Sequence, residues 1–316
     1  NVNGRLNIRT GRTPALAVVQ GVVYAAWSET RSVPNSADTY DTVVVRHLGP
    51  SGWVSDGEIN FGAIEGKLII DIAIADVGGV PHVAFSQFTS KSFGASKVNK
   101  PGTVQVFKLS GASWIELGGV LNVSTNNYPN YLAMAIHGGR PYLAWQERSA
   151  SGNNQLYVKH WDGASWVADG GSLNVNPASG EAGRPALASD GLKLWLAWAE
   201  GALGEKAKLY VRSFSGSTWS SAEGPLNIDS VNAPADHPAL AIASGIVQVI
   251  WAEKDANSYT KQVYVKGRDT SGAFVSTPLG RWGANGSTAA IPSHTWVNMQ
   301  AGGIALGNGV GDEGFD

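Results

Sequence analysis

Residues 185–212 read PALASDGLKLWLAWAEGALGEKAKLYVR, and this stretch decides the fold. An Ala-rich run ends at a Ser-Asp-Gly turn, an alternating apolar run follows, and a polar stretch leads into a third run, LYVR. Short runs separated by turn residues are typical of β-strands. The central run is apolar on both faces, with Leu194, Leu196 and Trp198 on one face and Trp195 and Ala197 on the other. A strand of this kind is expected to be buried between two other layers.

The same plan recurs along the chain. A Leu-Asn or Ile-Asn dipeptide begins at residues 6, 59, 121, 173 and 226, which indicates a repeat of about 53 residues. An aromatic residue followed two positions later by Glu or Gln comes about 25 residues after each dipeptide, as Trp27/Glu29, Phe85/Gln87, Trp145/Glu147, Trp198/Glu200 and Trp251/Glu253. The predicted units are residues 1–58, 59–119, 120–171, 172–224 and 225–276, with 277–316 as a C-terminal extension.

Each repeat has room for four short strands, and no segment has the periodicity of an amphipathic helix. The sequence therefore predicts an all-β protein, a β-propeller of about five four-stranded blades over residues 1–276, or of six with an incomplete last blade. A two-sheet sandwich is disfavoured, because its strands would each need one polar face. The Ala-rich runs at 14–17, 185–188 and 238–241 are expected to be the innermost strands, where large side chains do not fit.

The repeat also resembles that of secreted and cell-surface β-propeller proteins of bacteria and archaea. Residues 114–174 carry the pattern most fully, with Trp114, Gly118-Gly119, Leu121-Asn122, Pro141-Tyr-Leu-Ala-Trp, Glu147, Leu156-Tyr-Val-Lys, Trp161, Gly163 and Trp166. The resemblance implies a location outside the cell or on its surface. Because the chain opens with Asn1, Val2 and Asn3, without a Met or a signal-like segment, we expect a processed mature chain. The repeats are also distantly similar to those of sialidases, although Trp161 and Phe214 stand where the Asp-box of that family has its aspartate.

Composition excludes several classes of function. The 316 residues include 23 basic and 25 acidic side chains, a formal charge of −2 that does not suit a nucleic-acid partner. There is no Cys, and no apolar run approaches the roughly 18 residues of a membrane span. The six His residues lack metal-site spacing, and there is neither a Gly-rich phosphate loop nor a serine-nucleophile elbow. We therefore expect no metal and no cofactor.

The repeated Glu shares its strand face with the repeated Trp, so it is expected at a blade interface, where a carboxylate needs a partner. The third strand offers a basic residue in the same four units, and the unit with Gln87 has Phe107 instead. We interpret these residues as structural, joined by an ion pair or a shared hydrogen-bond network: Glu29, Glu147, Glu200 and Glu253 with Arg46, Lys159, Arg212 and Lys266.

In an array of similar units, a ligand site is expected where one unit departs from the others. The second unit has Asp71 on its first strand, Gln87 in place of Glu, and a long loop over 88–102. In the third unit Tyr131 stands at the position of Asp71. Long loops on a rigid scaffold are common binding surfaces. The candidate ligand-binding residues are Asp71, Gln87, Asn126, Asn127, Tyr128 and Tyr131.

Amides, phenols and a carboxylate suit a sugar, whose hydroxyls need bidentate partners and whose apolar face needs an aromatic ring. The first hypothesis is a glycan-binding surface module. The alternative is a glycoside-cleaving enzyme, which would need a second carboxylate, and Glu65 is the nearest candidate to Asp71. A third hypothesis is an extracellular assembly that self-associates through residues 279–316, with part of 291–306 adding as a strand to this or another molecule and residues 1–7 completing the last blade.

Overall fold

The computed structural model describes residues 11–33, 35, 39–59, 67–89, 102–124, 126–149, 152–202, 206–243, 245–254 and 261–276, with the backbone of 295–298 and 305–308. All regular elements in these ranges are β-strands, in agreement with the predicted fold class. The described residues contain no helix that could serve as a membrane span. The chain divides into two compact units, residues 1–173 and 174–316.

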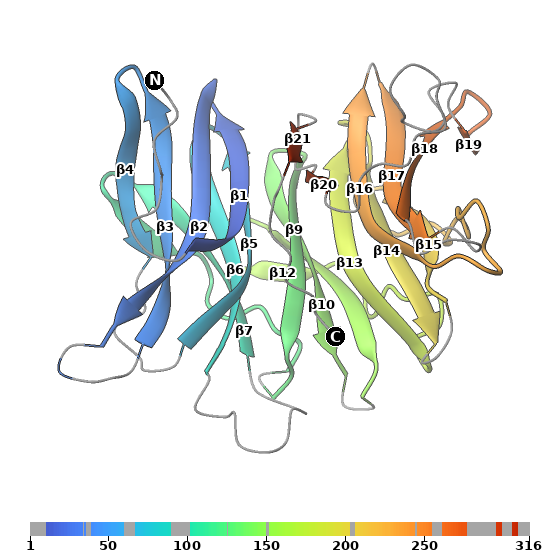
Figure 1. Ribbon diagram of the computed structural model, residues 1–316, viewed down its shortest axis with the longest axis horizontal. Coiled ribbons are helices and arrows are strands. Elements are labelled where there is room, and N and C mark those ends of the chain that lie inside the picture. The colour runs from blue at the N-terminus through green and yellow to red at the C-terminus, as the bar shows by residue number, and fades with distance from the viewer. Residues whose placement is uncertain are drawn as a thin grey trace. The chain divides into compact units, whose positions relative to one another are not determined.

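Unit 1 holds three four-stranded antiparallel sheets, each joined in simple up-and-down order (Figure 1). The strands of the first sheet are β1 (Gly11–Val19), β2 (Val22–Ser32), β3 (Thr39–Gly49) and β4 (Gly52–Ile59). Those of the second are β5 (Lys67–Val77), β6 (Val80–Thr89), β7 (Gly102–Ser110) and β8 (Ser113–Glu116). Those of the third are β9 (Pro129–His137), β10 (Arg140–Arg148), β11 (Asn154–Trp161) and β12 (Trp166–Ala168).

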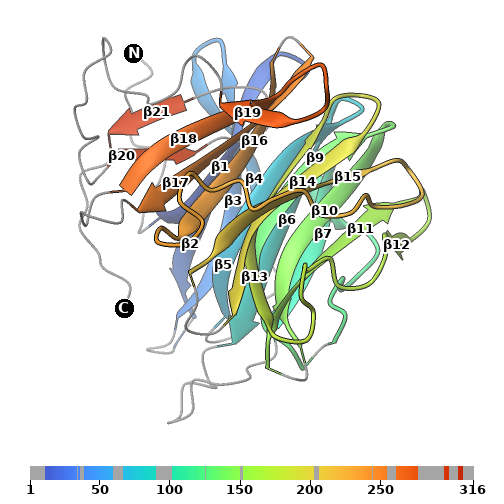
Figure 2. The ribbon, with the colours of Figure 1, turned by 90° about the vertical axis from the view of Figure 1, so that its right-hand side faces the viewer.

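Unit 2 repeats the plan twice (Figure 2). Its first sheet contains β13 (Gly180–Ser189), β14 (Leu194–Ala202) and β15 (Lys208–Phe214), and the second contains β16 (Ala235–Ala243), β17 (Ile246–Lys254), β18 (Lys261–Arg268) and β19 (Phe274–Ser276). The first of these sheets has three strands, because the fourth-strand segment pairs with β15 only through the isolated bridges Val211–Glu223 and Phe214–Trp219. We number the five sheets as blades 1 to 5 in chain order.

The C-terminal extension contains β20 (Thr295–Asn298) and β21 (Ala305–Asn308), which pair with each other. Among the described strands, neither one hydrogen-bonds to a blade. Most of 291–306 lies outside the described residues, so the addition of part of this segment to this or another molecule stays a prediction. Residues 1–7, expected to complete the last blade, lie outside the described residues.

Within each unit the core lies between neighbouring sheets, because strands such as β5 contribute side chains from both of their faces. In unit 1, Ile72 and Ile74 of β5 pack against Val43 and Val45 of β3, while Ala73 on the other face of β5 belongs to the cluster shared with blade 3. In unit 2 one apolar cluster likewise joins blades 4 and 5. The largest wholly buried side chains include the repeated aromatic residues Trp145, Trp198, Trp251 and Phe85, as the repeat pattern predicts.

Candidate functional site

In blades 3 to 5 the repeated Glu holds the loop that follows the Leu-Asn dipeptide. Glu147, fully buried on β10, accepts hydrogen bonds from the backbone N–H groups of Val123 (3.0 Å) and Ser124 (2.8 Å). It also accepts one from the Trp145 indole Nε1 (2.8 Å) and one from the Asn127 side chain (3.0 Å). Four donors on one carboxylate offset the cost of burying its charge.

The same arrangement is present in both blades of unit 2, and we call it the carboxylate clamp: a buried Glu, the Trp two residues before it, and two successive backbone N–H groups. Each Trp donates its Nε1–H to the Glu at 2.8 Å. The clamps of unit 2 are Glu200 with Val175, Asn176 and Trp198, and Glu253 with Ile228, Asp229 and Trp251. In blade 1, Glu29 accepts from Trp27 (2.9 Å) and from the guanidinium of Arg31 (2.6 Å).

No ion pair joins the basic residues to the clamp carboxylates in the described parts of blades 3 to 5, which leaves the shared hydrogen-bond network of the two alternatives. Lys159 donates to the carbonyl of Leu121 at 2.7 Å, and its ammonium lies 5.8 Å from the centre of the Trp145 ring. The Trp explains the arrangement, since its face meets the cation while its N–H edge meets Glu147. The two charges thus share one hydrogen-bond network around the Leu-Asn loop.

The other basic residues follow the same rule. Lys266 donates to the Leu226 carbonyl at 2.7 Å, while Arg212 donates to the carbonyls of Ser220 and Asn174. The cationic groups lie about 6 Å from the indole centres of their own blades, as Arg46 over Trp27 (6.0 Å), Arg212 over Trp198 (5.9 Å) and Lys266 over Trp251 (5.9 Å). Burial lowers the pKa of Lys159, Arg212 and Lys266, and the nearby Glu charges oppose that shift.

Blade 2 has a different set of contacts at the place where blades 3 to 5 have the carboxylate clamp. Gln87 is buried and donates its amide hydrogens to Thr103 (3.0 Å) and Gln105 (2.9 Å), while its Oε1 has no hydrogen-bond partner in the described part of the chain. Phe107, at the position of the cation, stacks on Phe85 with ring centres 5.6 Å apart. Gln87 can therefore orient its neighbours more readily than it can touch a ligand.

Asp71 lies on the first strand of blade 2 and reaches blade 3. Its Oδ2 accepts from the backbone N–H of Leu132 at 2.7 Å, and its Oδ1 accepts from that of Ile72 at 2.9 Å. The side chain is half-buried. The carboxylate is thus fixed beside Tyr131, the residue just before Leu132, as the shared position of Asp71 and Tyr131 in the repeat predicts.

The two tyrosines of the candidate set lie close together. Tyr131 has a left-handed backbone, with φ of 50°, and its N–H is held by the Asn130 side chain at 2.8 Å. Tyr128 packs against Phe88 of blade 2 with ring centres 5.4 Å apart. Burial, and then the proximity of Tyr131, raises the pKa of Tyr128 to about 12, so its hydroxyl keeps its proton.

The amides of the candidate set have different surroundings. Asn126 is exposed, whereas the Asn127 side chain donates to Glu147 and its carbonyl accepts from Gly102 N at 3.0 Å. Glu65 lies outside the described residues. The structure therefore brings together Asp71, Tyr128 and Tyr131, with Asn126 in the adjoining loop; we call these four residues the loop-end site.

The backbone at the loop-end site reveals residues that sequence reasoning missed. The pairing of the first and second strands shifts at one equivalent place in every blade, a β-bulge. Four of these bulges hold a non-glycine residue with positive φ, namely Thr13 (46°), Tyr131 (50°), Arg184 (54°) and His237 (49°). Asp71 stands at the same repeat position in blade 2, but it has no positive φ, and the residue that the pairing skips there is Ile70. Three of the residues immediately precede the Pro of a Pro-Ala-Leu-Ala run, which is the signal that could have identified them.

In unit 2 the bulge residues form a charged cluster. Arg184 donates to His237 Nε2 (2.6 Å) and pairs with Asp236 (3.1 Å), and His237 Nδ1 lies 2.8 Å from the same carboxylate. Lys261 adds a fourth contact at 3.2 Å. Burial alone would raise the pKa of Asp236, but the hydrogen bond from His237 Nδ1–H and the charges of Arg184 and Lys261 lower it well below the usual value. In the described residues no three His, Asp or Glu side chains gather as a metal ion requires.

Several solved structures share the fold. The chain is similar to a Trypanosoma rangeli sialidase (TM-score 0.54, 12% identity, 87% of this chain and 49% of that one). It is also similar to a Lactobacillus brevis α-L-arabinofuranosidase (0.52, 12%, 83% and 92%) and to a Penicillium chrysogenum α-L-arabinanase (0.51, 10%, 80% and 77%). The fold is a five-bladed β-propeller.

Neither the family models nor the curated proteins contain a match to this chain. At 10 to 12% identity the structural likeness establishes the fold alone. The chain spans about half the length of the sialidase. What the protein binds must therefore be argued from its own residues.

Proposed function

We propose that the protein binds carbohydrate, and that the loop-end site of blades 2 and 3 makes the contacts. The observation that carries the proposal is the position of Asp71, whose carboxylate is held by Leu132 N–H beside Tyr131. A fixed carboxylate accepts hydrogen bonds from neighbouring sugar hydroxyls, and a phenol adds a donor and an apolar face. The three structural neighbours are named for enzymes that act on sugars, which also supports this ligand class.

Rigid support strengthens the proposal. Asp71 and Tyr131 project from paired strands, and Tyr131 keeps a left-handed backbone that is costly for a bulky residue. Strained positions of this kind are common where a side chain must be aimed at a ligand. The half-buried Tyr128 supplies a second phenol that stays protonated. A polysaccharide ligand fits a protein that acts outside the cell, and we include that location in the proposal.

A glycan array covering neutral and acidic oligosaccharides tests the proposal, followed by calorimetry on the best ligand. Tyr131→Gly removes the phenol and suits the positive φ, while Asp71→Asn keeps an acceptor for Leu132 N–H but removes the charge. We expect each variant to weaken binding about tenfold or more, as loss of a charged or aromatic contact does, while the protein remains folded in a cooperative thermal melt.

The matched control makes the same change of charge elsewhere in blade 2. Glu116→Gln lies on β8, at the opposite edge of the sheet from β5, and should bind normally. Full binding by both Tyr131→Gly and Asp71→Asn would overturn the proposal.

The same experiment distinguishes binding of a glycan from its cleavage. A glycoside hydrolase would use two carboxylates, one on each side of the bond. Incubation of the array ligands with the protein, followed by measurement of reducing ends, reports cleavage directly. If the wild type releases reducing sugar and Asp71→Asn does not, the hypothesis of a glycoside-cleaving enzyme would replace that of a binding module. Self-association through 279–316 stays a separate prediction, tested by comparing the mass in solution of the full chain with that of a chain ending at residue 276.

A further inference from the structure

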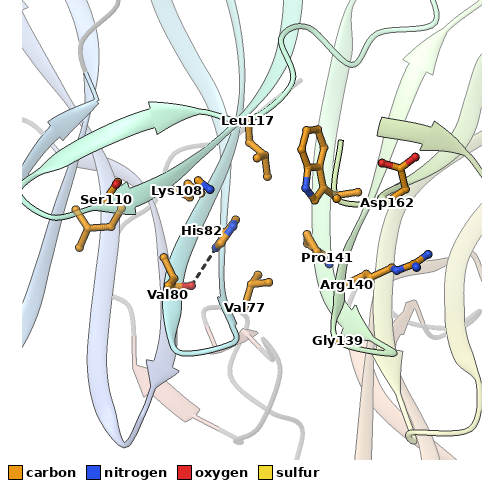
Figure 3. A pocket seen from close by; sticks show the side chains of 13 residues that line it. Val77, Val80, His82, Lys108, Ser110, Leu117, Gly139, Arg140, Pro141 and Asp162 are labelled. Atoms are coloured by element: carbon orange, nitrogen blue, oxygen red, sulfur yellow. Dashed lines mark hydrogen bonds between the residues drawn. The ribbon is translucent and has the colours of Figure 1, made fainter. Parts of the chain in front are cut away.

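A pocket lies in unit 1, at the other end of the strands from the loop-end site (Figure 3). It has a volume of about 460 Å³ and is lined by residues of blades 2 and 3 around the Gly78-Gly79 and Gly138-Gly139 turns. Val77, in the wall of the pocket, lies six positions after Asp71 on β5, which is about 20 Å along a strand. We call it the turn-end pocket. Its volume suits a small ligand of one or two sugar rings.

Two cations of the pocket have no counter-ion within the described ranges. Lys108 lines one side from β7, and Arg140 lines the other from the start of β10. Neither side chain makes a hydrogen bond or ion pair with any residue that the structure describes. Asp162 also lines the pocket but makes no ion pair with either cation in the described residues; its carboxylate accepts from the N–H groups of Ala164 and Ser165 (both 2.7 Å) in its own turn.

A buried acceptor lies in the same wall. His82 is 6% exposed, and its Nδ1 lies 3.0 Å from the carbonyl oxygen of Val80, so Nδ1 carries the proton (Figure 3). Burial, and also the charge of Lys108, lowers the pKa of His82, so the ring is neutral at pH 7. Nε2 of His82 is then a hydrogen-bond acceptor with no partner in the described part of the chain.

An aromatic wall completes the pocket. Trp161 lines it, and its ring lies so close to the backbone of Gly118 that a Cβ there would be only 2.6 Å from the indole. Gly118 has φ of 80°, and the absence of a side chain allows this approach. Leu117 and Pro141 add apolar surface. An indole set in an apolar wall is the usual platform for the C–H face of a sugar ring.

We propose that the turn-end pocket binds a sugar that carries a carboxylate, a uronic acid residue. The carboxylate would pair with Lys108 and Arg140, a hydroxyl would donate to His82 Nε2, and the ring would stack on Trp161. This site is separate from the loop-end site and does not depend on it. A neutral sugar would leave both cations unpaired, so the pocket should discriminate by charge.

Calorimetry with glucuronate, galacturonate and mannuronate, and with their trimers, tests the inference, using glucose, galactose and mannose as neutral controls. We expect at least one acidic sugar to bind, and the neutral sugar of the same configuration to bind about tenfold more weakly or not at all. Lys108→Gln together with Arg140→Gln should abolish the difference. These substitutions break no contact of the described residues, so Tm should not change.

Two further variants separate this site from the loop-end site. Tyr131→Gly should leave binding of the acidic sugar unchanged, while Trp161→Leu should weaken it about tenfold because the stacking surface is lost. The inference is wrong if no acidic sugar of the panel binds at millimolar concentration, or if the double variant binds as the wild type does. Loss of binding in Tyr131→Gly alone would also overturn it, by assigning the ligand to the loop-end site.

Discussion

The carboxylate clamp and the first-strand bulge both recur along the chain. In the clamp the side chains recur, whereas in the bulge the backbone conformation recurs. In blades 3 to 5 the clamp uses the same side chains in the same contacts, a Trp and a Glu around a Leu-Asn loop. The bulge repeats its backbone rather than its side chain: the positive-φ residue is Thr, Tyr, Arg or His in four blades, and in blade 2 Asp71 stands at that repeat position without a positive φ. The unchanged Trp and Glu of the clamp make the same structural contacts in blades 3 to 5. A varied polar side chain on a uniform backbone points to a task that differs between blades, such as contact with a ligand.

The comparison predicts that clamp variants lose stability while bulge variants lose binding. The largest effect is expected for Trp198→Ala. The indole is fully buried, holds Glu200 and lies against Arg212, so its removal leaves a cavity and two poorly partnered charges. We expect the free energy of unfolding to fall by about 3 to 5 kcal/mol. Chemical denaturation measures this, and a loss below about 1 kcal/mol would show that the clamp does not hold the blade.

The next effect separates the hydrogen bonds of the clamp from its packing. Glu147→Leu leaves the N–H groups of Val123 and Ser124 and the Trp145 Nε1–H without their acceptor. We expect a loss of about 2 to 4 kcal/mol, since unsatisfied buried donors are costly. Glu147→Gln keeps one acceptor oxygen and should cost about half as much. If the leucine variant were the more stable of the two in thermal melts, the polar contacts would not be needed.

This contrast also explains how much could be predicted from sequence. The clamp is visible because fixed contacts demand fixed residue types, so Leu-Asn and Trp-x-Glu recur and reveal the number of blades. The hydrogen-bond partners within the clamp cannot be predicted from the sequence, because the partners of Glu147 are mostly backbone groups, which any residue supplies. The bulge cannot be predicted from the sequence, because its backbone conformation recurs with unrelated side chains and so leaves no repeated residue type. The turn-end pocket combines side chains from strands of two blades, and no local motif connects His82 with Arg140.

A pH experiment examines the bulge of blade 5, where the charged cluster around Asp236 is expected to stabilise the folded state. Burial opposes ionisation of this carboxyl, but the hydrogen bond from His237 and the charges of Arg184 and Lys261 lower its folded pKa. A depressed carboxyl pKa stabilises the folded state above the unfolded pKa, near 4, and the contribution is lost as the pH falls from there towards the folded pKa. We expect Asp236→Asn to be less stable than wild type at pH 6, with the difference narrowing below about pH 4. A constant difference across this range would exclude the charge as the cause.

The smallest effect concerns the backbone of the bulge itself and uses substitutions at one residue. Tyr131 has φ of 50°, where any side chain with a Cβ is strained and glycine is not. Both Tyr131→Ala and Tyr131→Gly remove the phenol, so their difference isolates the backbone conformation. We expect the glycine variant to be more stable than the alanine variant by about 1 kcal/mol, the reverse of the usual order. Ala133→Gly, two residues along the same strand and without a positive φ, is the matched control and should lose about 0.5 to 1 kcal/mol. Chemical denaturation of the three variants measures both differences. If glycine were destabilising at both positions, the bulge would relax when its side chain is removed, and the left-handed backbone would be a consequence of Tyr131 rather than a property that the blades share.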